Sequence, residues 1–148
     1  MSEHQISLQW ENGSNPVAAN TYTRNHTVTV NGPQTMQVSA AKDYKGDPAC
    51  ADPEQLMISA LASCHMLTFL AIAEMQGYKV ESYTDVATGY LGKGENKIPA
   101  VTRIELQPKV IFSEEKIPDA AALKRLHAGA HKNCFIANSL KTEVSVAE

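Results

Sequence analysis

Residues 52–76 read DPEQLMISALASCHMLTFLAIAEMQ, and this stretch decides the fold. Asp52 is able to accept backbone N–H bonds as an N-cap, Pro53 suits the first helical position, and Gln55 stands where a capping box requires it. Gly77 follows as a natural stop, because glycine adopts the left-handed conformation at a helix C-terminus without steric strain. The stretch therefore predicts one long helix, from Pro53 to about Gln76.

The predicted helix is apolar over most of its circumference. No formally charged residue occurs over residues 55–73, a length that is also compatible with a membrane span. The segment nevertheless contains Ser, Cys, His and Thr side chains, and its flanks are the acidic Glu54 and Glu74 instead of Lys or Arg. We therefore expect a helix surrounded by protein in a globular fold, with no membrane partner.

Strand patterning precedes the helix. Thr, Val and Tyr are frequent over residues 22–30, residues 31–33 (Asn-Gly-Pro) have turn chemistry, and an apolar alternation resumes over residues 35–40. This pattern predicts a hairpin, with a short strand before it over residues 6–10. Residues 41–52 mix Lys, Gly, Pro and Asp and are expected to form a loop.

Strands and helices also follow the long helix. Strand composition covers residues 80–91, interrupted by Gly89, and a turn-rich connection covers residues 92–99. In the next strand region the apolar positions keep even parity, and Pro108 predicts a bulge or an edge because proline cannot donate to the ladder. The remaining expected elements are a helix over 118–130, a shorter helix over 134–140 and a strand around 144–146.

The order of these elements predicts an α+β fold. It runs strands, long helix, strands, two helices and a strand, without the strand-helix alternation that a parallel doubly wound sheet requires. The chain has 148 residues, 43% of them hydrophobic and 20% charged, which suits one core. We expect a single domain over residues 1–148, with antiparallel sheets wrapped around a long, buried central helix.

Charge and the N-terminus narrow the functional classes. The formal net charge is −3 and no long basic run occurs, so electrostatics gives no attraction to nucleic acid or to an anionic membrane. The N-terminal sequence MSEHQISLQW lacks the basic and apolar regions of a secretory signal. We therefore expect a cytoplasmic protein with no nucleic-acid partner.

Three cysteines in a reducing compartment indicate thiol chemistry more than structural disulfides. Cys64 lies about 16 Å along the helix from Pro53 at ~1.5 Å per residue, so it is either an inert apolar residue or is activated by a cation from elsewhere. Cys134 is expected in the first turn of a short helix with Asn133 as cap, where free N–H groups favour a thiolate. It is the more activated cysteine on local grounds, and Cys50 has no activating neighbour.

Two other chemistries use the same residue types. Cys64 and His65 are adjacent and point to different helix faces, and His131 with Cys134 is only half of a zinc pattern, so we expect no metal. A Cys–His hydrolase or acyl transferase is possible in principle, but no oxyanion-type glycine loop accompanies either cysteine. The three imidazoles of His26, His65 and His131 are each expected to be structural.

Two motifs point to a family. Residues 52–56 (DPEQL) lead to residues 60–65 (ALASCH), and residues 130–140 read AHKNCFIANSL. The first resembles the segment of OsmC/Ohr proteins, a family of thiol-dependent peroxidases, that holds the peroxidatic cysteine. The second resembles the family segment around the resolving cysteine, and the order of strands and helices matches over nearly the whole chain.

The resemblance implies an intertwined homodimer with the cysteine-bearing helices at its centre. It assigns Cys64 as the peroxidatic cysteine and Cys134 as the resolving cysteine, and it matches Arg24 and Glu54 to the arginine and glutamate that hold the thiolate. Glu54 precedes Cys64 by about 15 Å along one helix, so its help must be indirect or come from the other chain. Our hypothesis is that Arg24 bridges Cys64 and a Glu54 carboxylate.

The implied reaction is a two-step thiol cycle with no metal, haem or flavin cofactor. A Cys64 thiolate attacks an organic hydroperoxide and becomes a sulfenic acid, Cys134 condenses with it to a disulfide, and an external dithiol, of lipoyl type in Ohr-like members, reduces the disulfide. Apolar residues around Cys64 favour an organic substrate over hydrogen peroxide. The alternative is a non-catalytic redox sensor or small-ligand-binding protein on the same fold.

Overall fold

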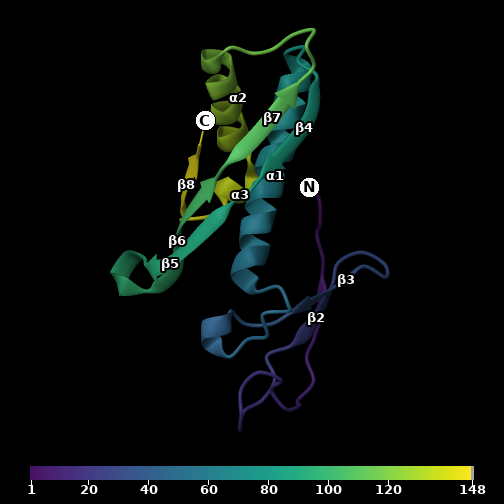
Figure 1. Ribbon diagram of the computed structural model, residues 1–148, viewed down its shortest axis with the longest axis vertical. Coiled ribbons are helices and arrows are strands. Elements are labelled where there is room, and N and C mark those ends of the chain that lie inside the picture. The colour runs from purple at the N-terminus through teal and green to yellow at the C-terminus, as the bar shows by residue number, and fades with distance from the viewer. Residues whose placement is uncertain (148) are drawn as a thin grey trace. The chain divides into compact units, whose positions relative to one another are not determined.

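The computed structural model describes residues 1–147 and divides into two compact units, residues 1–56 and residues 57 onward. Figure 1 follows the elements of both units in chain order. The prediction of one domain over residues 1–148 stays a prediction.

The first unit is built on an antiparallel sheet in the order β1-β2-β3, followed by a short 3-10 turn. Its hairpin turns at residues 31–34, where the Gln34 N–H donates to the Asn31 carbonyl oxygen at 3.0 Å, as the turn chemistry predicts. The strands are shorter than the pattern predicts. Their bounds are β1 (Ser7–Gln9), β2 (His26–Thr29) and β3 (Thr35–Val38), and the turn is η1 (Lys42–Tyr44).

Helix α1 (Pro53–Met75) confirms the prediction made from its sequence. The capping box is reciprocal: the Gln55 N–H donates to Asp52 Oδ1 at 2.8 Å, and the Asp52 N–H donates to Gln55 Oε1 at 2.9 Å. After the helix ends, Gly77 takes φ +82°, the left-handed conformation expected of it.

The second unit contains two sheets. One pairs β4 with β7 and the other has the order β5-β6-β8. Strand β8 runs parallel to β6, so the prediction of antiparallel sheets is wrong for this pair. The chain passes through β7 and two helices between these strands, a crossover long enough for parallel pairing. The strands are β4 (Val80–Asp85), β5 (Thr88–Lys93), β6 (Pro99–Leu106), β7 (Pro108–Phe112) and β8 (Glu143–Val146), with a 3-10 turn η2 (Glu95–Lys97) after β5.

The prediction that Gly89 interrupts the strand region is wrong. Gly89 lies inside β5, and the break between β4 and β5 falls at residues 86–87. A Cβ at Gly89 would stand 2.6 Å from Ile58 Cδ1 of α1. The glycine therefore permits a close approach of β5 to the long helix.

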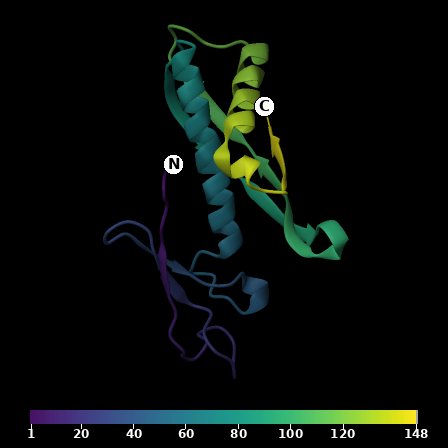
Figure 2. The same cartoon turned by 180° about the vertical axis from the view of Figure 1, so that it is seen from behind.

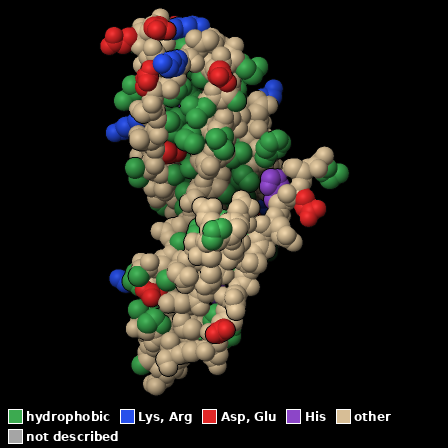
Figure 3. Space-filling view, turned by 90° about the vertical axis from the view of Figure 1, so that its right-hand side faces the viewer, with side chains coloured by type: hydrophobic (Ala, Val, Ile, Leu, Met, Phe, Trp, Pro, Cys, Tyr) green, Lys and Arg blue, Asp and Glu red, His purple; other side chains and the backbone are tan. Residues whose placement is uncertain are grey.

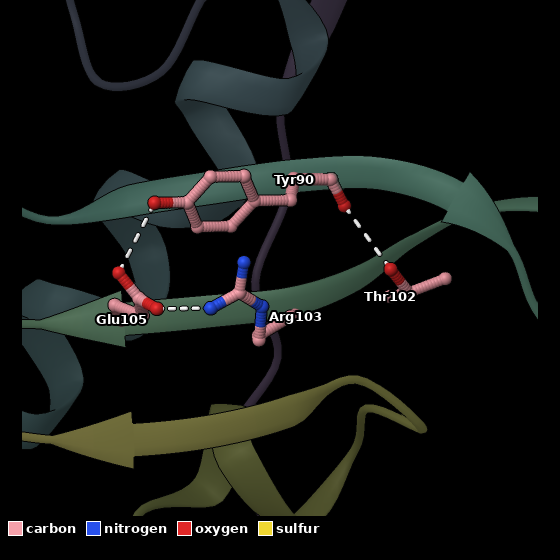
Figure 4. A network of polar contacts seen from close by, with 4 residues as sticks. All are labelled: Tyr90, Thr102, Arg103 and Glu105. Carbon is pink, nitrogen blue, oxygen red and sulfur yellow. Dashed lines mark hydrogen bonds and ion pairs between the residues drawn. The ribbon is translucent and has the colours of Figure 1, made fainter.

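A polar network ties β5 to β6 on a partly exposed surface (Figure 4). Arg103 lies over the Tyr90 ring, 4.0 Å from its centroid, and forms an ion pair with Glu105. The Tyr90 hydroxyl donates to the same carboxylate at 3.1 Å. The network supports the register of this strand pair.

Two further helices complete the unit, α2 (Ala120–Asn133) and α3 (Phe135–Asn138). Helix α2 begins two residues later than the Pro118 start predicted. The cause is Asp119, whose Oδ1 accepts from the Ala122 N–H at 2.7 Å and so acts as the N-cap. The ribbon views place α2 beside α1 (Figures 1 and 2), and ring contacts between Phe69 and His127 join them.

The core of the second unit follows one stripe of α1. Leu61 packs in one cluster with Ile104, Leu106 and Cys134. The second cluster contains Phe69, Ala73, Leu126 and Ala130. Two buried histidines, His65 and His127, complete the set of buried side chains on these two helices.

Within one chain, α1 is fully buried along one stripe only. The opposite side of the helix includes exposed apolar residues, and Leu67 and Met75 are 60% and 85% exposed. Figure 3 shows hydrophobic side chains gathered on one face of the second unit. The prediction of a helix surrounded by protein therefore holds for one stripe only in the single chain. By length and composition alone α1 also meets the criteria for a membrane span, as the core helix of a soluble protein does.

Candidate thiol site

Cys64 and Cys134 meet in the second unit. Cys64 lies in the middle of α1, Cys134 lies between α2 and α3, and the two side chains are joined by a hydrogen bond. Both thiols are free; Cys64 is partly buried and Cys134 is fully buried. The predicted pair is therefore in contact in the reduced state.

Donors from α3 and from α1 surround the Cys64 sulfur. Burial acts to raise its pKa, but hydrogen bonds from the Cys134 thiol, from the backbone N–H groups of Ile136 and Phe135 and from the Thr68 hydroxyl outweigh this effect and lower it. The Thr68 hydroxyl also lies 2.8 Å from the Cys64 carbonyl oxygen. With one proton, it donates to one of the two acceptors at a time.

Cys134 is shifted in the opposite direction. Burial, and then the hydrogen bond and charge of Cys64, raise its pKa, although the Ala137 N–H donates to its sulfur at 3.4 Å. The prediction that Cys134 is the more activated cysteine is therefore wrong. Cys134 is itself the N-cap of α3, so the first free N–H groups of that helix reach Cys64. Asn133 is not the cap; it ends α2, and its Nδ2 donates to the Gly129 carbonyl oxygen at 2.8 Å.

The pair therefore has complementary roles. A thiolate is favoured at Cys64, and a thiol that keeps its proton is favoured at Cys134. Within the second unit, the described donors that lower the pKa of Cys64 are uncharged N–H, O–H and S–H groups. Activation by a cation from elsewhere stays a prediction. Such a pair has a nucleophile and a proton-bearing second thiol already in contact.

Arg24 and Glu54 belong to the first unit. The Arg24 guanidinium lies over the Tyr22 ring, 3.8 Å from its centroid, and donates to Thr21 Oγ1 at 3.1 Å and to the Tyr22 carbonyl oxygen. It lines a cavity of about 820 Å³ whose other walls include Trp10, His26, Tyr44 and Lys45. The bridge from Arg24 to Cys64 and Glu54 stays a prediction.

Glu54 lies in the first turn of α1. Its Oε2 is buried, and within the described residues it has no hydrogen-bond partner. A buried carboxylate oxygen without a donor is unfavourable, so this atom is a natural acceptor for a group from another chain or for a bound molecule.

The sequence analysis missed Thr68 as a neighbour of Cys64, and it missed His127 as the partner of His65. Thr68 stands four residues after Cys64, a helical spacing that places both side chains on one face and could have indicated the contact. His127 has no comparable local signal, because its partner His65 lies far away in the sequence. Among the described residues, no group of three or more His, Cys, Asp or Glu side chains is arranged to hold a metal ion.

Solved structures of other proteins share the fold of this chain. The chain is similar to the structure of an OsmC-like protein of unknown function from Vibrio cholerae, with 42% identity, 99% of each chain covered and a TM-score of 0.92. It has the fold of an organic hydroperoxide resistance protein OsmC from Legionella pneumophila (17% identity, 100% and 98% covered, TM-score 0.73). It also has the fold of the organic hydroperoxide resistance protein OhrB of Bacillus subtilis (16% identity, 98% and 95% covered, TM-score 0.66).

No curated protein sequence matched the chain. The family model for OsmC-like proteins matches residues 46–148, which include both motifs and both cysteines. The chain therefore belongs to the OsmC-like protein family, which includes peroxide-resistance proteins.

Proposed function

We propose that this protein is a thiol-dependent peroxidase that reduces organic hydroperoxides through Cys64 and Cys134. The observation that carries the proposal is the contact between two free thiols, Cys64 on α1 and Cys134 between α2 and α3. The lowered pKa of Cys64 supplies a nucleophile, and the raised pKa of Cys134 keeps a proton next to it.

The first step oxidises Cys64. Its thiolate sulfur attacks the peroxide oxygen that carries the proton, the O–O bond breaks, and Cys64 becomes a sulfenic acid. The alkoxide leaves and takes a proton from solvent water to become an alcohol. The N–H groups of Phe135 and Ile136 stabilise the thiolate before the attack.

The second step forms the disulfide. The Cys134 sulfur attacks the Cys64 sulfenic sulfur, an S–S bond forms, and the hydroxyl leaves as water with the Cys134 proton. An external dithiol then gives two electrons and two protons and is itself oxidised to a disulfide. Cys64 is partly exposed and Cys134 is buried, so the dithiol attacks at Cys64. We propose a lipoyl-type dithiol and a cytoplasmic location for this cycle.

An organic substrate is favoured by the surroundings of the site. Partly buried apolar side chains pack around the cluster that contains Cys134, among them Met57, Ile58, Ala62 and Ile136. An alkyl group buried against them gains about 25 cal/mol per Å² of apolar surface, a gain that hydrogen peroxide lacks.

We further propose that the active form is a homodimer. The support is the exposed apolar face of α1, which includes Leu67 and Met75 and which a second copy of the same helix would cover. In this dimer Arg24 supplies a guanidinium to the Cys64 thiolate, and Glu54 orients that guanidinium through its unpartnered oxygen.

The test is peroxide consumption by the purified protein. We expect turnover of an alkyl hydroperoxide with dithiothreitol or dihydrolipoamide, no turnover by Cys64→Ser, and loss of dithiol-driven cycling in Cys134→Ser. Cys50→Ser is the matched control and retains activity. Activity that is absent, or that survives in Cys64→Ser, would replace this proposal with the alternative of a redox sensor or ligand-binding protein on the same fold.

A further inference from the structure

Two buried imidazoles join α1 to α2. His65 and His127 are 1% and 3% exposed, and His65 Nε2 lies 3.0 Å from His127 Nδ1. The ring planes are 7° from parallel and the centroids are 5.3 Å apart. The nitrogens are much closer than the centroids, so the rings meet edge to edge and one N–H···N hydrogen bond joins them.

His65 is uncharged near neutral pH. Burial first, and then the positive charges that His127 and His131 would carry, lower its pKa to about 4. One proton therefore lies between the facing nitrogens, and the bond has one donor and one acceptor. Such a bond is satisfied only over a narrow range of distances and directions.

The rest of this helix contact is apolar. Phe69 and Leu126 pack with Ala73 and Ala130, and a Cβ at Gly129 would stand 3.2 Å from Ile72 Cδ1. Apolar contacts are non-directional. Among the described residues of this unit, His65 and His127 are the buried polar side chains, so their hydrogen bond is a directional contact between the two helices.

The same helices carry the two cysteines. Cys64 directly precedes His65 on α1, and Cys134 is the C-cap of α2, seven residues after His127 or about 10 Å along a rigid helix. A shift of α2 along α1 therefore moves Cys134 relative to Cys64. A disulfide tolerates only a small shift of one cysteine relative to the other, because its two Cβ atoms must stand about 3.5–4.5 Å apart.

We propose that His65 and His127 are positioning residues: their hydrogen bond sets the register of α2 on α1 and thereby holds Cys134 where it forms a disulfide with Cys64. The inference rests on the proposed function only in taking the two cysteines as a disulfide-forming pair. It does not require that peroxide be the oxidant.

The geometry supplies matched variants. An asparagine amide stands near the place of the imidazole Nδ1, and a glutamine amide stands near the place of Nε2. His127 uses its Nδ1, so His127→Asn keeps a partner for His65, whereas His127→Gln moves the amide away and His127→Leu removes it. Leu126→Val trims the same helix contact without touching the bond and serves as the packing control.

The measurement is the equilibrium between the Cys64–Cys134 disulfide and a glutathione redox buffer, read by thiol alkylation and mass spectrometry at neutral pH. We expect His127→Leu and His127→Gln to lower the equilibrium constant about tenfold, and His127→Asn and Leu126→Val to stay within about threefold of wild type. If His127→Leu does not fold, the Asn and Gln variants carry the comparison.

Two results would overturn the inference. One is an equal equilibrium constant in His127→Asn and His127→Gln, and the other is a loss in Leu126→Val as large as in His127→Gln. A protein that consumes no peroxide but shows the expected order in glutathione refutes the proposed peroxidase and leaves the positioning role intact. A wild type that forms no Cys64–Cys134 disulfide in glutathione refutes both.

Discussion

At the scale of residues, the chemistry of the site depends on which of two touching thiols carries the proton. The donors around Cys64 are a thiol, two backbone N–H groups and a hydroxyl, and together they outweigh the effect of burial on its pKa. Cys134 is more deeply buried and faces the developing charge of Cys64, so its pKa is raised. Each donor that a variant removes should therefore shift reactivity at Cys64 in a known direction.

Replacing Cys134 by alanine should raise the pKa of Cys64, because the thiol that donates to it is lost. Replacing it by serine keeps an O–H donor and should leave the pKa closer to that of wild type. The pH dependence of the iodoacetamide reaction rate at Cys64 measures both. A pKa that falls in Cys134→Ala would show that Cys134 does not stabilise the thiolate.

Thr68→Val should also raise the pKa of Cys64, because one hydroxyl donor among several disappears without a large change in volume. Thr68→Ser retains the hydroxyl and is the matched control. The same alkylation profile decides the outcome, and identical profiles for the valine and serine variants would exclude the hydroxyl as a donor to this sulfur.

At the scale of elements, α1 begins where its sequence says it should. The capping box between Asp52 and Gln55 satisfies two backbone N–H groups that the first turn leaves free. Short helix α3 has the contrasting role. Its first N–H groups are satisfied in part by sulfur atoms of Cys134 and Cys64, so this helix start belongs to the site.

Asp52→Ala should lower the free energy of unfolding by about 1 kcal/mol, because the Gln55 N–H loses its acceptor. Asp52→Ser preserves an acceptor oxygen and should cost less. Urea unfolding followed by circular dichroism gives both values. Equal stability of the alanine variant and wild type would mean that water replaces the cap at no cost.

At the scale of the whole molecule, the buried histidine pair makes stability depend on pH. The pKa of His65 is about 4 in the folded protein against 6.5 for an unperturbed imidazole. Between these values the unfolded chain binds more protons, so the free energy of unfolding falls as pH falls from 6.5 towards 4. Two other titratable groups lie near the pair. His131 on α2 is one of the groups that lower the pKa of His65. Tyr83 on β4 packs against Phe69, which also contacts His127, and burial raises the pKa of Tyr83, so its hydroxyl is neutral over this pH range.

Between pH 6.5 and pH 4.5, we expect the free energy of unfolding of wild type to fall by on the order of 2 kcal/mol more than that of His65→Gln. The glutamine amide replaces Nε2 and does not titrate, so the comparison removes the contribution of carboxylates that both proteins share. Urea unfolding at several pH values provides the data. Parallel curves for the two proteins would mean that His65 binds its proton equally in the folded and unfolded states.

The exposed face of α1 yields a prediction about assembly. Leu67→Glu should produce a monomer in sedimentation velocity, because a carboxylate on this face opposes its burial against a second copy. Ile117→Glu introduces the same charge at an exposed apolar residue outside the helices and should leave the dimer intact. A wild-type protein that sediments as a monomer would contradict the proposed homodimer.

The sequence by itself determined the helix that organises the fold, the pair of cysteines and the family. These features depend on local signals: a capping box, a glycine stop and motifs of fewer than a dozen residues. Such signals act through hydrogen bonds and backbone conformations within a few residues of each other, so they remain legible in the sequence.

Only the tertiary structure decided which groups surround Cys64, how β8 pairs and which histidine His65 meets. Local reasoning favoured Cys134 because it placed a helix start there, but folding turns the N–H groups of α3 towards Cys64. The parallel pairing of β8 with β6 and the bond from His65 to His127 likewise join distant segments. A pKa depends on burial and on neighbours within a few ångströms, and packing, not sequence spacing, brings those neighbours together.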